Sequence, residues 1–269
     1  MEENKDYITF KDYIENKLGL KIVETNYRAV SRFIDERLRF YKCRIGNYIE
    51  IIQKDQDELH KAINIVTINE TYFFREHKYY RLLDEQIFKD YKLSGKVPTC
   101  WSAASSIGAE ALSIALIINK NWGLKGKSDP RILATDVDSI ALSKINENMY
   151  SKRLMKSDGS IFHTLITANS TNCGDDFSLN NDIIKAIRTQ QFNLVKDDYS
   201  RISGTFDIVF LCNLLTYMDN EYKKKIINSI VPKINKDGYL ILSSSDTAFI
   251  EHSELQLEQN LNSFYFRKL

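Results

Sequence analysis

The stretch that decides the fold runs from Thr99 to Ile118 and reads Thr-Cys-Trp-Ser-Ala-Ala-Ser-Ser-Ile-Gly-Ala-Glu-Ala-Leu-Ser-Ile-Ala-Leu-Ile-Ile. A short β-prone segment passes into small residues, turns at Gly108 and continues as an apolar helix. This order predicts the first strand, tight loop and first helix of an α/β sheet, where the loop backbone and the unpaired helix N–H groups approach a ligand. Strand–glycine–helix turns also occur in unrelated proteins, so the interpretation depends on the residues further along the chain.

An acidic residue lies downstream at a suitable distance. Arg131–Thr135 reads as a second strand, and Asp136 comes at its carboxyl end, 28 residues after Gly108. A carboxylate at this place can accept hydrogen bonds from a ribose, as in dinucleotide-binding folds with a spacing of about 20 residues or a little more. Phe206–Cys212 is a continuous apolar run typical of a central parallel strand, and Ser263–Arg267 reads as an antiparallel strand at or near the sheet edge. The sequence therefore predicts an α/β, Rossmann-like domain.

A helical region precedes this domain. From Tyr7 to about Arg81 the apolar residues recur at helical spacing, and no proline interrupts them. The polar segment Lys89–Lys96 is the natural boundary, because it contains a glycine and is followed closely by a proline. We therefore expect a small all-helical N-terminal domain over 1–88 and the α/β domain over 89–269.

The segment 152–190 within the α/β domain is the least regular part of the sequence. It is polar and rich in Ser, Asn and Thr, with Ile161–Ile166 as candidate β-strand. Long structureless loops are uncommon in compact domains, so a small insertion or subdomain is the expectation here.

One predicted helix, Tyr27–Lys42, carries cations opposite its apolar stripe. They are Arg28, Arg32 and Arg39, extended by Arg37, Lys42 and Arg44. This face is either simply solvated or a docking face for an acidic helix or peptide, and the sequence leaves both interpretations open.

The overall charge is balanced. The 269 residues include 37 Lys and Arg against 36 Asp and Glu, a net charge of +1, so there is no global attraction to nucleic acid or to an anionic membrane. The four cysteines form no C-x-x-C pair, and the four histidines show no metal spacing. The polar start is unlike a secretory signal, and no apolar run reaches the ~20 residues that span a bilayer. We therefore expect a cytoplasmic protein that binds neither metal nor nucleic acid and does not insert into membranes.

Several stretches together resemble the chemotaxis receptor methyltransferase (CheR) family. They occur in the family's order and are Ile65-Val-Thr-Ile-Asn-Glu-Thr-Tyr-Phe-Phe-Arg-Glu, Trp101-Ser-Ala-Ala-Ser-Ser-Ile-Gly-Ala-Glu, Ala134-Thr-Asp-Val-Asp, Phe206-Asp-Ile-Val-Phe with Asn213 and Tyr217, and Val231-Pro-Lys-Ile-Asn-Lys-Asp-Gly. The resemblance implies a Rossmann-like S-adenosylmethionine-dependent methyltransferase domain after a helical domain that docks the receptor. It further implies methyl transfer from S-adenosylmethionine to glutamate side chains on the cytoplasmic helices of chemoreceptors. The products are a glutamyl methyl ester and S-adenosylhomocysteine.

The resemblance also implies roles for individual residues beside the loop at Gly108. Matched to the family pattern, the methionine end of the cofactor and the active site are lined by Asn69, Thr71 and Arg75. Glu110 takes the ammonium of the cofactor, and Asp136 binds the ribose hydroxyls. The residues beside the adenine are Asn193, Leu194, Asn213 and Leu214. Tyr217 faces the transferring methyl group, so Arg75 and Tyr217 are the candidate catalytic residues.

The implied chemistry needs few special groups. A glutamate carboxylate is already ionised near neutral pH, so no general base is required, and alignment of the reacting atoms is what remains. The guanidinium of Arg75 can hold a carboxylate bidentately. That carboxylate belongs to the substrate or to the cofactor, and the sequence leaves the choice open.

The sequence departs from the family at the cofactor loop. Ile107-Gly-Ala-Glu-Ala-Leu112 stands where the family usually has Thr-Gly-Glu-Glu-Pro-Tyr, and Cys212 replaces a common arginine. These changes raise a second interpretation, a degenerate relative that binds S-adenosylmethionine or its product as a regulatory or binding module. A methyltransferase for small molecules or RNA is a third interpretation, against which the balanced charge argues.

Overall fold

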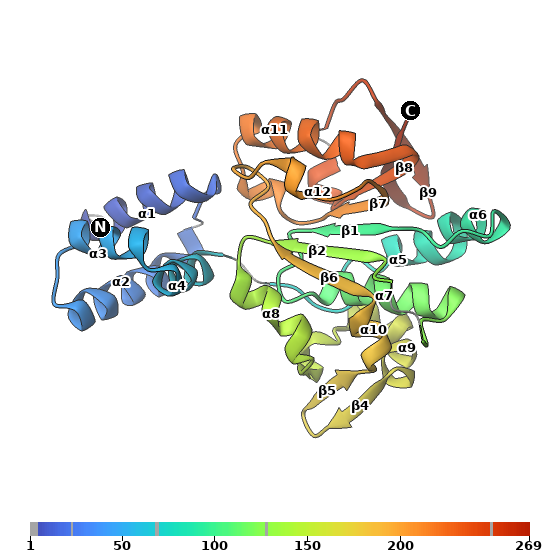
Figure 1. The fold of residues 1–269 in the computed structure, drawn as a ribbon, viewed down its shortest axis with the longest axis horizontal. Coiled ribbons are helices and arrows are strands. Elements are labelled where there is room, and N and C mark those ends of the chain that lie inside the picture. The colour runs from blue at the N-terminus through green and yellow to red at the C-terminus, as the bar shows by residue number, and fades with distance from the viewer. Residues whose placement is uncertain (1–4, 23, 68–69, 127–128, 248–249) are drawn as a thin grey trace.

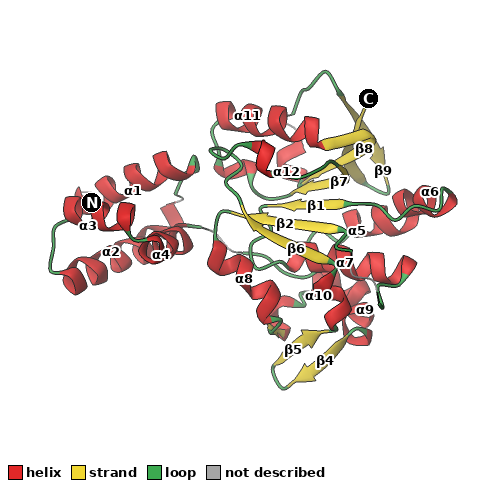
Figure 2. Cartoon of the chain, in the orientation of Figure 1, coloured by secondary structure: helices red, strands yellow, loops and turns green. Residues whose placement is uncertain are grey.

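The computed structural model describes residues 5–22, 24–67, 70–126, 129–247 and 250–269. Asn69, one of the predicted site residues, lies outside the described residues. The described chain has two parts, a helical region at one side and a twisted sheet covered by helices (Figure 1). Figure 2 shows that all strands lie in the second part.

The helical region has its own core. Its helices are α1 (Lys5–Leu18), α2 (Tyr27–Tyr41), α3 (Ile45–Lys54) and α4 (Gln56–Val66). Apolar residues such as Phe10, Ile34 and Ile52 are fully or almost fully buried between them. The predicted helical patterns of this region are confirmed, because each helix buries one apolar stripe.

The second part is built on a seven-stranded mixed sheet in the order β6-β2-β1-β7-β8-β10-β9. Its strands are β1 (Cys100–Ala103), β2 (Ile132–Asp136), β6 (Ile187–Gln191), β7 (Phe206–Leu211), β8 (Ile234–Leu242), β9 (Leu255–Asn260) and β10 (Ser263–Lys268). The first five are parallel, whereas β10 runs antiparallel to β8 and β9. The predicted α/β fold is confirmed, with the Phe206 run in the middle of the sheet and the Ser263 strand next to its edge.

Helices cover both faces of this sheet (Figure 1). They are α5 (Lys78–Leu82), the π-helical turn η2 (Leu83–Ile87), α6 (Phe88–Leu93), α7 (Ala109–Trp122), α8 (Ser139–Glu147), α9 (His163–Ala168), α10 (Asn181–Lys185), α11 (Asn220–Ile230) and α12 (Ser244–Thr247). Successive side chains of a strand point to opposite faces. Accordingly Ile208 packs in the core beneath α7, while its neighbour Val209 packs in the core beneath α11. Burial on both faces explains why the central strands β1 and β7 are mostly apolar, whereas the edge strands β6 and β9 carry more polar residues.

The segment 150–179 forms a small three-stranded antiparallel sheet with short helices. Its strands are β3 (Tyr150–Ser151), β4 (Ser170–Cys173) and β5 (Asp176–Leu179), in the order β3-β5-β4. The expectation of a strand at Ile161–Ile166 is wrong, because these residues are helical. Phe162 and Ile166 are both buried and four residues apart, the spacing of one helix face.

The stretch between the two parts also differs from the sequence expectation. The helical pattern predicted to reach Arg81 is interrupted at 71–77, which is irregular. Phe74 and Glu76 have positive φ angles of 57° and 55°, which an α-helix does not allow. Tyr79 and Phe88 pack in the core of the sheet, while the domain limits at residues 88 and 89 stay a prediction. Among the described helices, none is both long and apolar enough to span a bilayer.

Candidate active site

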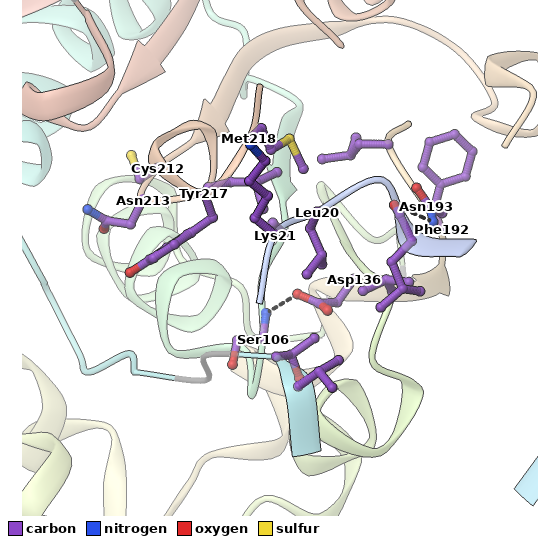
Figure 3. A pocket seen from close by; sticks show the side chains of 17 residues that line it. Leu20, Lys21, Ser106, Asp136, Phe192, Asn193, Cys212, Asn213, Tyr217 and Met218 are labelled. Carbon is purple, nitrogen blue, oxygen red and sulfur yellow. Dashed lines mark hydrogen bonds between the residues drawn. The ribbon is translucent and has the colours of Figure 1, made fainter. Parts of the chain in front are cut away.

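The strand order reverses between β1 and β7, since β2 lies on one side of β1 and β7 on the other. Ligands of open α/β sheets bind at such a point, outside the carboxyl ends of the strands. The loops that follow β1, β2, β6 and β7 converge there and line a cavity. The lining residues are Leu18, Leu20, Lys21, Val66, Thr67, Ala104, Ser106, Asp136, Val137, Phe192, Asn193, Leu194, Cys212, Asn213, Leu214, Tyr217 and Met218. We call this the nucleoside cavity (Figure 3).

Part of the nucleoside cavity wall comes from the helical region. The Asn193 Nδ2 donates to the carbonyl oxygen of Leu18 at 3.1 Å. The Lys21 N–H donates to the carbonyl oxygen of Tyr217 at 3.1 Å, and the Lys21 Nζ lies 2.7 Å from the Asp219 Oδ1. The end of α1 is thus tied to the strand ends on both sides of the cavity.

A second tie joins α4 to the sheet beside the cavity. Asp138 caps α8 by accepting hydrogen bonds from the Ile140 and Ala141 N–H groups through its Oδ1. Its Oδ2 accepts from the Asn64 Nδ2 at 2.8 Å and from the Thr67 Oγ1 at 3.2 Å. The helical region therefore closes over the nucleoside cavity from two anchored points.

Asp136 lies at the end of β2 and is 8% exposed. Its Oδ2 accepts from the Ser106 N–H at 2.7 Å (Figure 3). Its Oδ1 accepts from the Asp138 N–H at 2.9 Å. Burial raises the pKa of Asp136 to about 6, although these backbone donors lower it. A carboxylate has about four acceptor sites, so the fixed Asp136 can still accept from ribose hydroxyls.

A second cavity adjoins the first, and we call it the methionine cavity. Its lining residues are Glu70, Thr71, Tyr72, Arg75, Tyr80, Ala104, Ser105, Ser106, Glu110, Cys212, Asn213 and Tyr217. Ala104, Ser106, Cys212, Asn213 and Tyr217 line both cavities. The two hollows therefore meet at the β1 and β7 loops and can hold one elongated ligand.

Glu110 lies in the first turn of α7 and accepts from the Ser102 Oγ at 2.7 Å. Burial raises the pKa of Glu110 to about 7, more than the bonds from Ser102 and Cys212 lower it. Burial also raises the pKa of the Cys212 thiol well above its ordinary value, so a neutral group stands where the family commonly has an arginine. Residue 212 therefore provides no positive charge beside the Glu110 carboxyl group.

The methionine cavity fits the zwitterionic end of S-adenosylmethionine. It presents the acid Glu110 for an ammonium and the cation Arg75 for a carboxylate. Ser105, in the loop that follows β1, also lines this cavity. Its buried hydroxyl has no hydrogen-bond partner among the described residues. The nucleoside cavity fits the other end, with Leu20, Val66 and other apolar side chains for an adenine beside the acceptor Asp136.

The structure brings most of the predicted site residues together. Thr71, Arg75 and Glu110 line the methionine cavity; Asp136, Asn193, Leu194 and Leu214 line the nucleoside cavity; Asn213 and Tyr217 line both. Figure 3 shows Asn213 and Tyr217 on one side of the nucleoside cavity and Asp136, Phe192 and Asn193 on the other. The roles of these residues stay predictions.

Gly108 has a different position from the other predicted residues, because it lines neither cavity. It precedes α7 with a φ angle of 86°, and a Cβ there would lie 2.2 Å from the Ile145 Cγ1. Only glycine therefore fits between the loop and α8. Gly108 aims the first turn of α7, and with it Glu110, at the methionine cavity.

Sequence reasoning missed the contribution of the helical region, Leu18 to Lys21 and Val66 to Thr67. No local signal marks these residues, because apolar positions at helix ends are ordinary core candidates. It also missed Tyr80, Ser105 and Met218. The small residues at 102–106 were the available signal for Ser105.

Comparison with known proteins agrees with this geometry. A family model described as CheR methyltransferase, SAM binding domain, matches residues 69–263. Chemotaxis protein methyltransferase 2 of Vibrio cholerae serotype O1 is 28% identical over 90% of this chain and 85% of its own length. The chemotaxis protein methyltransferase of Listeria innocua serovar 6a is 26% identical, covering 98% of this chain and 97% of its own.

Among solved structures, TrmN from Thermus thermophilus matches with a TM-score of 0.40 and 12% identity over 66% of this chain and 47% of that one. The family model covers well over half of the chain and includes both cavities, apart from the wall contributed by the helical region. The chain therefore belongs to the CheR methyltransferase family and carries its domain for binding S-adenosylmethionine.

Proposed function

We propose that this protein transfers the methyl group of S-adenosylmethionine to glutamate side chains on the cytoplasmic helices of chemoreceptors, in chemotaxis adaptation. The products are glutamyl methyl esters and S-adenosylhomocysteine. The observation that carries the proposal is the meeting of the two cavities at Asn213 and Tyr217, with Arg75 and Glu110 in one and Asp136 in the other. The relatives are named chemotaxis protein methyltransferases, which supports chemoreceptors as the substrate.

In this proposal the residues bind and align, and none acts as a general acid or base in the methyl transfer itself. Glu110 holds the ammonium of the cofactor, Asp136 the ribose hydroxyls, and Thr71 lies at the methionine end. Leu194 and Leu214 lie against the adenine. When bound, S-adenosylmethionine supplies an electrophilic methyl group, and the neutral thioether is the leaving group.

Tyr217 and Arg75 are the candidate catalytic residues of this proposal. Tyr217 lines both cavities where they meet, which supports a place for its ring beside the transferring methyl group. Arg75 holds a carboxylate bidentately, and both the substrate and the cofactor offer one. Because the acceptor glutamate is ionised near neutral pH, neither residue has to remove a proton.

The helical region is proposed to dock the receptor through α2. The side chains of Arg28, Arg32 and Arg39 are exposed on this helix. Arg37 is not available to a partner, because its guanidinium is engaged by the buried Glu58. The sequence counted Arg37 among the cations that extend this face, whereas in the structure its guanidinium is bound to Glu58.

The test is transfer of radiolabelled methyl groups from S-adenosylmethionine to receptor-containing membranes, followed by base treatment. Label that is released as methanol identifies a methyl ester, and wild-type protein is expected to produce it. Arg75→Ala is expected to abolish most of this transfer. Tight cofactor binding without any transfer by the wild-type protein would overturn the proposal in favour of a binding module.

A further inference from the structure

We propose that Asp158 is a positioning residue for Arg75. Asp158 lies in the 3₁₀ turn η4 (Ser157–Phe162), which belongs to the small-sheet segment 150–179 rather than to the main sheet. This inference rests on the proposed role of Arg75 at the methionine cavity. It assigns to the small-sheet segment a task at the reaction site.

Arg75 lies on a strained turn. Its two neighbours, Phe74 and Glu76, both have left-handed φ angles, 57° and 55°. Non-glycine residues in this region are strained and persist only when their surroundings hold them. The turn that carries Arg75 must therefore be fixed from outside itself.

Asp158 provides three contacts to this turn. Its Oδ2 accepts from the Glu76 N–H at 2.9 Å and from the Tyr72 hydroxyl at 3.2 Å. Its Oδ1 lies 3.0 Å from the His77 Nδ1. The contacts fall on both sides of Arg75 in the sequence, so one carboxylate spans the turn.

Tyr72 connects Asp158 to the guanidinium itself. The Arg75 Cζ lies 5.7 Å from the centre of the Tyr72 ring, and the Tyr72 hydroxyl donates to Asp158. The Arg75 Nη1 also donates to the carbonyl oxygen of Glu70. Arg75 is thereby directed by the ring that Asp158 holds.

The turn that bears Asp158 is itself closely packed. A Cβ at Gly159 would lie 2.8 Å from the carbonyl oxygen of Phe73. The Phe162 ring stacks on the Phe74 ring, with centres 4.5 Å apart and planes at 17°. Asp158 is therefore attached to a rigid support, although its own side chain is 39% exposed.

An exposed ion pair contributes little to stability, so the effect of Asp158 is expected on transfer and not on folding. A displacement of about 1 Å at a positioning residue can cost about 10²-fold in rate. Asp158→Ala should lower kcat for methyl transfer at least about tenfold, with a small change in melting temperature. Asp90→Ala, at an exposed carboxylate of α6, is the matched control and should leave the rate unchanged.

Asp158→Asn separates the hydrogen bonds from the charge. The amide oxygen of this variant can replace Oδ2 as the acceptor for the Glu76 N–H and the Tyr72 hydroxyl, while the negative charge beside His77 is removed. This variant should keep most of the wild-type rate. An Asp158→Asn rate as low as that of Asp158→Ala would overturn the proposal.

A double-mutant cycle decides whether Asp158 acts through Arg75. Arg75→Lys keeps the charge and loses the bidentate geometry. In that background Asp158→Ala should lower the rate less than twofold, whereas full multiplication of the two losses would overturn the proposal.

A readout that does not depend on activity separates this inference from the proposed function. Hydrogen exchange of the amides in 71–77 should be faster in Asp158→Ala than in the wild-type protein, and unchanged exchange would overturn the inference. If the wild-type protein transfers no methyl group to receptor membranes, the proposed function fails on that result alone. Exchange in 71–77 then still decides whether Asp158 holds the turn.

Discussion

Binding of the cofactor is expected to depend on pH through Glu110. Burial raises the pKa of Glu110 to about 7, so its carboxyl group is largely protonated in the empty site below neutral pH. A ligand ammonium binds the ionised form, and binding must therefore release a proton when the pH is low. The affinity for S-adenosylhomocysteine, which carries the same ammonium, should rise with pH.

The size of the effect is set by the pKa. With a pKa of about 7, about one Glu110 in eleven is ionised at about pH 6 and about ten in eleven at about pH 8. The dissociation constant should fall about tenfold over this range, or about 1.4 kcal/mol. Asp136, with a pKa of about 6, adds a further factor of about two if its ionised form is needed by the ribose.

Glu110→Gln is the control variant. The Gln oxygen can still accept from the Ser102 hydroxyl but cannot titrate. Its affinity should be lower than that of the wild-type protein at about pH 8, by the ~1.5–3 kcal/mol of a hydrogen bond to a charged group. At each pH the affinity of the wild-type protein is divided by that of Glu110→Gln. The titration of the ligand and of Asp136 affects both proteins equally and cancels, so the pH dependence of this ratio comes from Glu110.

The assay is isothermal titration calorimetry with S-adenosylhomocysteine at several pH values, in buffers of different ionisation enthalpy. The buffer dependence counts the protons released, and Glu110 alone should contribute close to one at about pH 6. A wild-type affinity that is flat in pH, or a pH profile that Glu110→Gln retains in full, would refute the reasoning.

The same pKa makes a prediction for folding. The carboxyl pKa is raised on folding from 4.5 to about 7, so the contribution of Glu110 to stability is present below about pH 4.5 and is lost as the pH rises through 7. The cofactor-free Glu110→Gln variant should therefore be more stable than the wild-type protein at about pH 8, by on the order of 3 kcal/mol. Chemical denaturation of both proteins at about pH 5 and about pH 8 measures their difference in unfolding free energy. A difference that is the same at both pH values would contradict this prediction.

Three further variants test other parts of the structure. Arg75→Ala should reduce methyl transfer by about 10²-fold or more while shifting the melting temperature little, and parallel losses of both would indicate a structural arginine. Gly19→Ala should weaken the binding of S-adenosylhomocysteine measured by calorimetry. The φ angle of Gly19 is +75° and a Cβ there would lie 2.6 Å from the Val195 Cγ1, so the substitution should push the end of α1 away from the nucleoside cavity. An affinity equal to that of the wild-type protein would contradict this. Arg37→Ala should destabilise the protein by about 3–5 kcal/mol in denaturant titrations, because it leaves the buried Glu58 carboxylate without its main partner, and a value below about 1 kcal/mol would return Arg37 to the docking face.

Much of the fold is encoded in local patterns of the sequence. The apolar run at Phe206–Leu211, the turn at Gly108 and the carboxylate at Asp136 are each recognisable within a few residues, and the structure confirms the sheet that they predict. The helices of the N-terminal region are equally local, because one apolar stripe identifies each of them. Local patterns failed at 71–77 and at Ile161–Ile166, where contacts with distant segments set the backbone.

The sequence by itself determined the α/β order, the family motifs and nine of the 24 residues that line the two cavities, because backbone periodicity and turn chemistry act between near neighbours. Only the tertiary structure decided that α1 and α4 close the nucleoside cavity, that Glu110 has a pKa near 7, and that Asp158 reaches the Arg75 turn across more than 80 residues of chain. Burial and hydrogen bonds between such distant segments depend on how the whole chain packs, and no short stretch of sequence contains them.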